Sequence, residues 1–374
     1  MSVDSRRSFI QKLIAGTAGA FVFSKAGIAK KAIELKEEKT IKQIKPLGFQ
    51  WETSDPFLFC VHHEDFFPKG NDKMGPNASL EGRQIGQDFV IKDGWRMYHG
   101  SEVPGFPGHP HRGFETITVV KKGIVDHTDS LGASGRYGNG DVQWMTAGKG
   151  VQHAEMFPLL SKTKENPMEL FQIWLNLPKK DKFVEPHFKM LWSETIPTHN
   201  HKDENGNKTN VEVIIGNLYG DKAPTPPPNS WAFNADNQVA IWNIEMEPHA
   251  IWKVPIASKE INRTIYYFEG NGLQIDDTEI DHYHAAEVLA NRKITLKNGA
   301  EKASILVLQG KPIGEPVVQH GPMVMNTKAE IKQAFDDYQK TKFGGWPWKS
   351  YAQVHDRNKG RFAIHANGKE EIKS

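Results

Sequence analysis

Apolar residues recur at every second position in short stretches of this chain, which is the pattern of β-strands with one buried face. Between Phe171 and Leu177 the sequence reads FQIWLNL, so four apolar side chains share one face of an extended strand. Further runs rich in β-branched and aromatic residues predict strands at Phe89–Ile91, Thr116–Val120, Val211–Ile215, Val239–Ile244, Thr264–Phe268 and Ser304–Leu308. Turn signals occur at Gly138-Asn139-Gly140, Asn205-Gly206, Gly270-Asn271-Gly272 and Asn298-Gly299. Regular short strands with such turns predict an all-β sandwich or barrel.

Two segments depart from this pattern. A helix is predicted from Thr327 to Tyr338, because apolar residues there, among them Ile331 and Phe335, repeat at helical spacing. The run PTPPP at residues 224–228 cannot lie inside a sheet, so it predicts a loop near the junction of the two halves. With 374 residues the chain is long enough for two domains of ordinary size.

Two histidine motifs carry the candidate chemistry, namely His109-Pro110-His111 and His153-Ala154-Glu155. In each motif the two polar side chains stand at i and i+2, which puts them on the same face of a strand. Three imidazoles and one carboxylate converging on a point suit Fe(II), Mn(II), Ni(II) or Zn(II). The alternative is that these are solvated histidines or histidines satisfied within the core. Two such motifs in one domain, each flanked by glycine turns, favour a metal site.

Composition excludes several other classes of function. The chain carries 47 Lys and Arg against 45 Asp and Glu, a net charge of +2, so electrostatics give no case for nucleic-acid binding. Cys60 is the single cysteine, which rules out an intrachain disulfide and a CxxC zinc or redox motif. No Ser-His-Asp order, P-loop or GxGxxG occurs, so neither nucleophilic hydrolysis nor nucleotide binding has support.

The first 29 residues read as a targeting segment. Ser5–Ile10 (SRRSFI) resembles the twin-arginine export signal, and an apolar stretch too short to span a bilayer follows at residues 13–24. Gly27 and Ala29 are small residues placed suitably for signal peptidase. The alternative is a short amphipathic helix or a retained membrane anchor. We expect export to the periplasm, with membrane contact only during export.

Several segments together resemble the pirin family of the cupin superfamily. The two metal segments are the most specific, and the resemblance covers roughly residues 45–345. The matching segments are HPHRGFETITVV (109–120), GDVQWMTAGKGVQHAEM (140–156), QIWLNLP (172–178), Glu185-Pro186 and GEPVVQHGPMVMNT (314–327).

The resemblance implies a fold of two cupin β-barrels, jelly-roll-like and in tandem, with a short C-terminal helix. It divides the chain into an export signal (1–29), a linker (30–44), a metal-binding barrel (45–185), a degenerate barrel with the helix (186–345) and an extension (346–374). In the second half Phe268–Gly272 takes the hairpin position of Lys121–Gly123, and His282-Tyr283-His284 has no His-x-Glu partner. A lone pair of this kind is more often a surface or hydrogen-bonding feature.

By carry-over, His109, His111, His153 and Glu155 match the metal ligands of pirins. Glu115 holds the position of the usual cupin carboxylate ligand, and we expect it to be a supporting or structural residue instead. Among its neighbours, Arg112 is either paired with a carboxylate or a surface charge, and Gly113 permits a turn. Phe114, Trp144 and Met145 either wall a pocket or, as we favour, fill the core, while Gln143 and Glu115 are candidates to orient an imidazole.

The resemblance implies one of two activities. One is ring cleavage of the quercetin 2,3-dioxygenase type, in which Fe(II) brings a flavonol or similar aromatic together with O₂ and Glu155 takes the hydroxyl proton. Mn, Ni or Zn are the other metals to consider. The other activity, described for eukaryotic relatives, is binding of transcription factors that depends on the state of the iron, and it fits an exported protein poorly. The alternative to the oxygenase is therefore a non-catalytic metal-binding or redox-sensing protein of the cell envelope. We expect a monomer, with a small aromatic substrate and O₂ as partners.

Overall fold

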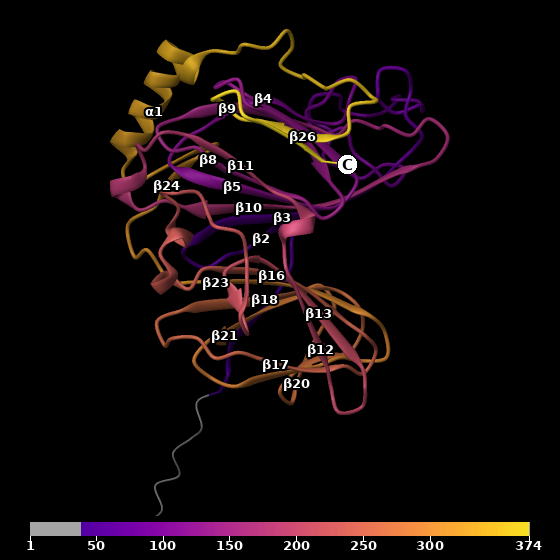
Figure 1. Ribbon diagram of the computed structural model, residues 1–374, viewed down its shortest axis with the longest axis vertical. Coiled ribbons are helices and arrows are strands. Elements are labelled where there is room, and N and C mark those ends of the chain that lie inside the picture. Colours follow the sequence, from indigo (N-terminus) through magenta and orange to yellow (C-terminus); the bar gives the residue numbers. More distant parts are fainter. Residues whose placement is uncertain (1–38, 374) are drawn as a thin grey trace, which may run out of the picture. The chain divides into compact units, whose positions relative to one another are not determined.

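Residues 39–373, which the computed structural model describes, form two β-barrels that pack against each other (Figure 1). Each barrel consists of two facing antiparallel sheets. The predicted all-β architecture with one short late helix is confirmed. The proposed export segment lies outside the described residues, and no helix within residues 39–373 is long and apolar enough to cross a membrane.

The N-terminal barrel pairs two six-stranded sheets. In spatial order the first contains β11 (His187–Leu191), β8 (Val142–Thr146), β5 (Phe114–Lys122), β10 (Asn166–Asn176), β3 (Phe57–Phe67) and β2 (Gln50–Trp51). The second contains β27 (Glu370–Lys373), β26 (Arg361–Ile364), β7 (Ser134–Gly138), β6 (Ile124–Asp129), β9 (Val151–Met156) and β4 (Gly105–His111).

The C-terminal barrel pairs a seven-stranded sheet with a four-stranded one. The larger contains β1 (Ile41–Pro46), β21 (His284–Leu289), β18 (Asn262–Glu269), β23 (Ala303–Gly310), β16 (Ala240–Met246), β13 (Lys208–Ile215) and β12 (Thr198–Lys202). The smaller contains β17 (Ile251–Val254), β22 (Ile294–Lys297), β19 (Leu273–Ile275) and β20 (Thr278–Ile280).

The remaining elements are short connections and one helix. Two small hairpins are β14 (Asn217–Leu218) with β15 (Asp221–Lys222), and β24 (Val318–His320) with β25 (Met323–Met325). The helix is α1 (Lys328–Thr341), and the side chain of Thr327 caps it by accepting from the backbone N–H of Glu330. The 3₁₀ turns are η1 (Lys179–Asp181), η2 (Ser193–Thr195), η3 (Trp231–Phe233), η4 (Ala235–Asn237) and η5 (Lys342–Gly344). The proline run 224–228 is a loop, as predicted.

The two barrels repeat one strand order. The order β4-β9-β6-β7 of the first barrel is matched by β17-β22-β19-β20 of the second, and β8-β5-β10-β3 is matched by β21-β18-β23-β16. Each strand of the first set therefore corresponds to one of the second by its place in both chain and sheet. The second half is a structural repeat of the first, as the sequence analysis expected.

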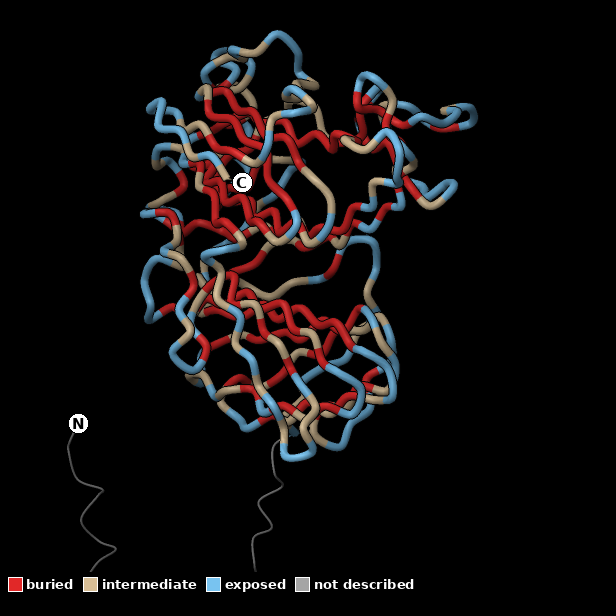
Figure 2. The backbone as a smooth tube through the Cα atoms, turned by 45° about the vertical axis from the view of Figure 1, so that its right-hand side comes forward, coloured by how far each residue is buried: buried red, intermediate tan, exposed pale blue. Residues whose placement is uncertain are grey.

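The sheets that face each other across the seam between barrels are buried on both sides. One hydrophobic cluster joins Ile117, Trp144 and Ile173 of the first barrel to Ile241 and Leu306 of the second. Figure 2 shows mostly buried backbone inside the barrels, with exposed positions mostly in the connecting loops. Because side chains alternate along a strand, the residues between these seam positions point into the interior of their own barrel.

Both ends of the described chain cross to the other barrel, which differs from the predicted boundaries. Residues 41–44, predicted as linker, belong to β1, which pairs with β21 of the C-terminal barrel. The predicted extension 346–374 contains β26, which pairs with β7 of the N-terminal barrel. The boundary at 185 falls just before β11, whose partner is β8. Strand edges left open within each half are thus covered by segments that are distant in the chain.

One predicted strand is wrong. Phe89–Ile91 lies in an irregular loop between β3 and β4, and the side chains of Val90 and Ile91 are exposed. Arg83 fixes the loop instead, because its guanidinium bonds Asp88 and the carbonyl oxygens of Lys92 and Trp95. The short apolar run at residues 89–91 has the composition of a strand. The hydrogen bonds from Arg83 to neighbouring residues hold it in a loop conformation instead.

Candidate metal centre

Neighbouring strands β4 and β9 bring the three predicted histidines together. In their antiparallel register His109 lies opposite His153, and His111 stands two residues further along β4 on the same face. The ring centres of His109 and His153 are 4.5 Å apart, and that of His111 is 4.8 and 4.9 Å from the other two. One ligand atom from each residue lies within 4.8 Å of the others. Among residues 39–373 this is the one such group of three or more.

The hydrogen bonding of these imidazoles fits a metal. Both ring nitrogens of His153 are buried without a hydrogen-bond partner, an arrangement that costs free energy unless something binds there. His109 Nδ1 lies 3.0 Å from the carbonyl oxygen of Pro107. Since a carbonyl only accepts, Nδ1 carries the hydrogen and the Nε2 lone pair is left for a ligand bond.

Burial keeps the three side chains in the state that binds metal. It lowers the pKa of His109 to about 4 and holds the pKa values of His111 and His153 well below the usual 6.5. Electrostatic repulsion between the neighbouring imidazoles acts in the same direction. The rings are therefore neutral at pH 7, and each offers a lone pair to a cation.

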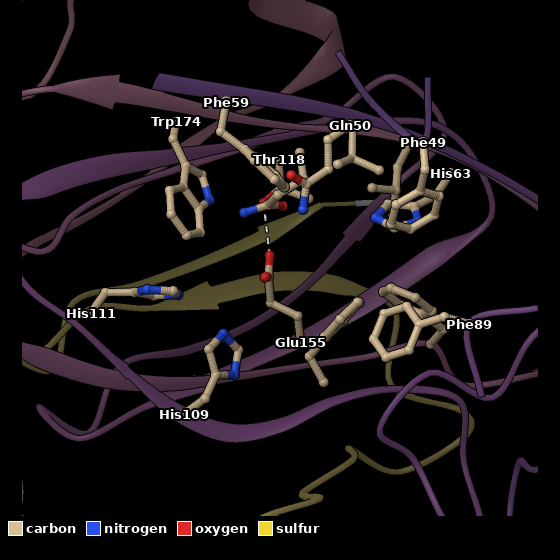
Figure 3. A pocket seen from close by; sticks show the side chains of 15 residues that line it. Phe49, Gln50, Phe59, His63, Phe89, His109, His111, Thr118, Glu155 and Trp174 are labelled. Atoms are coloured by element: carbon tan, nitrogen blue, oxygen red, sulfur yellow. Dashed lines mark hydrogen bonds between the residues drawn. The ribbon is translucent and has the colours of Figure 1, made fainter. Parts of the chain in front are cut away.

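Glu155, the predicted fourth ligand, lies at the edge of this group and not within it. Its Oε2 is 3.7 Å from His153 Nε2, while its Oε1 accepts a hydrogen bond of 2.7 Å from Thr118 Oγ1 (Figure 3). Burial raises the pKa of Glu155, and the bond from Thr118 opposes that rise. The carboxylate is thus beside the histidines and held by a neighbouring strand.

A pocket opens directly beside the histidines, inside the N-terminal barrel (Figure 3). About 660 Å³ of space between its walls holds no protein atoms, and part of that space is open to solvent. Aromatic and aliphatic side chains form about half of its lining, and polar side chains, those of the histidine motifs included, form the rest. The lining residues other than the histidine motifs come mainly from β3 and β10, and they include Phe59, Val61, His63, Leu170, Gln172 and Trp174.

None of the residues Phe114, Trp144 and Met145 lines this pocket. All three fill the hydrophobic core, which is the alternative that the sequence favoured. Phe114 packs behind the wall, with its ring centre 4.3 Å from that of Trp174. Trp144 lies in the seam between barrels, and Met145 packs against Ala147 and Val151. The aromatic walls come instead from other residues, among them Phe59 on β3, Phe106 on β4 and Trp174 on β10.

Glu115 faces away from the metal site, because it has the opposite parity to Thr118 on β5. Its carboxylate accepts from Thr146 Oγ1 at 2.7 Å and from Ser230 Oγ at 2.5 Å. Burial raises its pKa to about 7. Glu115 is therefore a structural residue of the seam. Its side chain lies on the face of β5 opposite to the metal site, so it is not placed to be a ligand.

The other candidates beside the motifs have structural roles. Arg112 pairs with Asp337 of α1 at 2.7 Å, which supports the carboxylate alternative. Gly113 has a φ of 86°, and a Cβ there would lie 2.0 Å from the carbonyl oxygen of Val324. Gln143 is buried, but its amide makes no hydrogen bond within the described residues and does not orient an imidazole.

The search for motifs missed Thr118 and Gln172, which lie opposite each other on β5 and β10. Gln172 Oε1 is 2.8 Å from Thr118 Oγ1, so both side chains meet beside Glu155. A signal existed in the sequence, because each is a polar residue with an apolar residue directly before and after it in a predicted strand. The alternation of side chains along β5 and β10 does not distinguish the face toward the pocket from the face toward the seam, because both faces are buried.

Comparisons with known proteins agree with this geometry. The pirin family model matches residues 42–175, and the model of the pirin C-terminal cupin domain matches residues 241–344. The chain is 37% identical over 247 residues to a pirin-like protein of Solanum lycopersicum, covering 65% of this chain and 78% of the relative. It is 36% identical over 263 residues to human pirin, covering 68% of this chain and 83% of the relative.

Solved structures include a similar chain described as a quercetin 2,3-dioxygenase from Acinetobacter baumannii. The TM-score is 0.62 at 26% identity, and the match covers 82% of this chain and 96% of that one.

Proposed function

This chain belongs to the pirin family, and from that premise we propose that it is a metal-dependent oxygenase of the quercetin 2,3-dioxygenase type. The reaction would open a ring of a flavonol or a similar aromatic compound with O₂. The observation that carries the proposal is a pocket lined by His109 and His111, directly beside His153, whose two ring nitrogens have no hydrogen-bond partner. The similarity to a quercetin 2,3-dioxygenase structure supports the same reaction class.

His109, His111 and His153 would hold the metal, with Glu155 as the fourth ligand or as a base beside it. We propose Fe(II), with Mn, Ni or Zn as the other ions that suit these donors. When bound, the metal supplies a Lewis acid and a template that brings the aromatic compound and O₂ together.

The chain's own residues prepare the substrate. Glu155 lies where it can accept the proton of a substrate hydroxyl, and its raised pKa makes it a better base than an exposed glutamate. Thr118 fixes the direction of that carboxylate through its bond to Oε1. The rings of Phe59 and Trp174, 4.8 Å apart, form a wall for a flat substrate and exclude water.

The test is oxygen uptake by Fe(II)-loaded protein when quercetin is added. We expect uptake by the wild type and loss of uptake in Glu155→Ala. Glu279→Ala, an exposed carboxylate of the C-terminal barrel, is the matched control and should retain uptake. If the loaded protein consumes no O₂ with any flavonol, yet changes a partner interaction reversibly on oxidation, it is a non-catalytic redox-sensing protein.

We also propose that the protein acts in the periplasm after twin-arginine export, since residues 5–10 carry the paired arginines. Folded export suits a metalloprotein, because its site is loaded before competing metals are met. Replacement of Arg6 and Arg7 by lysine should trap the precursor in the cytoplasm, as measured by fractionation. Normal export of the double variant would refute this assignment.

A further inference from the structure

A buried chain of hydrogen bonds ends at His63, on the pocket wall away from the metal motifs. Arg96 donates to both carboxylate oxygens of Asp65, through Nε and Nη2, at 3.0 Å each. Tyr98 Oη lies 2.5 Å from Asp65 Oδ2, and His63 Nδ1 lies 3.0 Å from Tyr98 Oη. Tyr98 is fully buried and His63 is 5% exposed. The proposed reaction uses none of these four residues.

The direction of each bond follows from the guanidinium at the start. Arg96 is always charged and forms a fork with Asp65, which favours the ionised carboxylate even though burial raises the pKa of Asp65. An ionised carboxylate only accepts, so the single hydroxyl hydrogen of Tyr98 goes to Asp65. The Tyr98 oxygen then accepts from His63, and Nδ1 of His63 carries the hydrogen.

This leaves His63 Nε2 as a hydrogen-bond acceptor. Burial, with the positive charge of Arg96, lowers the pKa of His63 to about 3, so the ring is neutral and has only one ring hydrogen. Within residues 39–373 no side chain or backbone group bonds Nε2, and this atom is not sealed from solvent. An acceptor without a protein partner therefore lies in the pocket wall, beside the rings of Phe49 and Phe106.

His63 and the metal motifs occupy different parts of one pocket. Figure 3 shows His63 beside Phe49, across the pocket from His111. Phe106 lies between His63 and His109, because its ring centre is 6.0 Å from that of His63 and 6.3 Å from that of His109. A flat molecule of several rings held at the histidines would reach His63 with its other end.

The backbone also indicates a held position. Tyr98 has a φ of 58°, in the left-handed region that a bulky aromatic residue rarely adopts. Such a conformation persists only where the surroundings enforce it, and it occurs more often at ligand sites than elsewhere. Here it directs the Tyr98 side chain toward both Asp65 and His63.

We propose that His63 Nε2 accepts a hydrogen bond from a hydroxyl group at the far end of the substrate, so that His63 selects hydroxylated aromatic compounds. The inference rests on the proposed function, because it assigns the other end of the substrate to the metal motifs. A substrate without that hydroxyl leaves a buried acceptor unpaired, which lowers affinity roughly 10- to 100-fold.

The test compares two flavonols as probes, quercetin and unsubstituted 3-hydroxyflavone, which lacks hydroxyl groups on the outer rings. Binding to the full chain is measured by fluorescence titration, in metal-free protein and in protein loaded with Zn(II), which has no redox chemistry. We expect the wild type to prefer quercetin by roughly 10- to 100-fold. His63→Phe, which keeps an aromatic ring but no acceptor, should remove most of this preference.

Two further variants separate selection from structure. His62→Phe makes the same change at the next residue, which faces the seam and stacks on Phe171 with ring centres 4.7 Å apart, so it should leave the preference unchanged. Tyr98→Phe keeps His63 but frees its Nδ1, and the preference should fall. A purely structural His63 would weaken both probes equally in His63→Phe and leave their ratio intact.

The proposal is overturned if wild-type protein does not prefer quercetin, if neither probe binds, or if His63→Phe retains the preference. Failure of the oxygenase proposal looks different, because then the preference persists while Fe(II)-loaded protein consumes no O₂. If Fe(II)-loaded protein consumes O₂ but does not prefer quercetin in the binding titration, the oxygenase proposal stands and the role of His63 is refuted.

Discussion

The two barrels share one strand order but fill their interiors differently. In the first, β4 and β9 turn His109, His111, His153 and Glu155 inward beside an open pocket. In the second, the corresponding strands β17 and β22 turn Trp252, Val254, Ile294 and Leu296 into a closed hydrophobic cluster. The same positions of one scaffold thus hold either a polar site or a core.

The comparison teaches that the scaffold alone does not determine the chemistry. A barrel filled with apolar side chains gains the free energy of burial, whereas one with a pocket and unpaired imidazoles forgoes part of it. The second barrel has no metal group among the described residues, and it lends stability through the seam. Within residues 39–373 His282 and His284 form hydrogen bonds with carbonyl oxygens, which agrees with the expected hydrogen-bonding role.

The largest expected effect concerns metal binding. His153→Ala should lower metal affinity by more than the roughly 10- to 100-fold that loss of an outer partner causes, since it removes a ligand from the group. His109→Ala and His111→Ala should do the same. His284→Ala, in the second barrel, is the control and should leave the affinity unchanged. Metal analysis after dialysis decides this, and metal retained by His153→Ala would break the distinction between the barrels.

The next effect concerns stability. Trp252→Ala should lower the free energy of unfolding by about 3–5 kcal/mol, because it leaves a cavity in a closed core. Trp174→Ala removes a pocket wall that is already open, so we expect a loss of only about 1–2 kcal/mol together with weaker flavonol binding. Denaturant titration of both variants measures the difference. Equal losses would show that the first barrel is as tightly filled as the second.

The third effect, which stays below that of Trp252→Ala, is at the seam, where Glu115→Gln should change how stability depends on pH. The pKa of Glu115 is about 7 in the folded protein against 4.5 as the ordinary value, so between these pH values only the folded state keeps the proton. The stabilising contribution is complete below about pH 4.5 and is lost as the pH rises through 7. Relative to the wild type, Glu115→Gln should therefore gain up to about 3 kcal/mol above pH 7.

Urea titrations at several pH values measure this gain, and the difference between the two proteins isolates Glu115 from other titrating groups. The metal content of Glu115→Gln should stay that of the wild type, because the carboxylate faces away from the histidines. Parallel pH profiles for the two proteins would contradict the buried position of this carboxyl group.

The candidate ligands could be predicted from the sequence because spacing in a strand has a local geometric meaning. Residues at i and i+2 share a face wherever the strand lies, so each motif brings its two side chains together. The all-β class, the late helix and the repeat of two halves also follow from local periodicity and turn residues. These properties depend on neighbours in the chain, and the sequence alone therefore determined them.

Only the tertiary structure decided which buried face is the pocket and which segments complete each barrel. Strands β5 and β10 lie between two cores, so alternation gave no means to tell Thr118 and Gln172 from the seam residues Glu115 and Ile173. The distant segments β1 and β26 cross to the other barrel, and Thr118 holds the Glu155 carboxylate at the edge of the histidine group. Each of these outcomes depends on contacts between residues far apart in the chain, and local patterning carries no information about them.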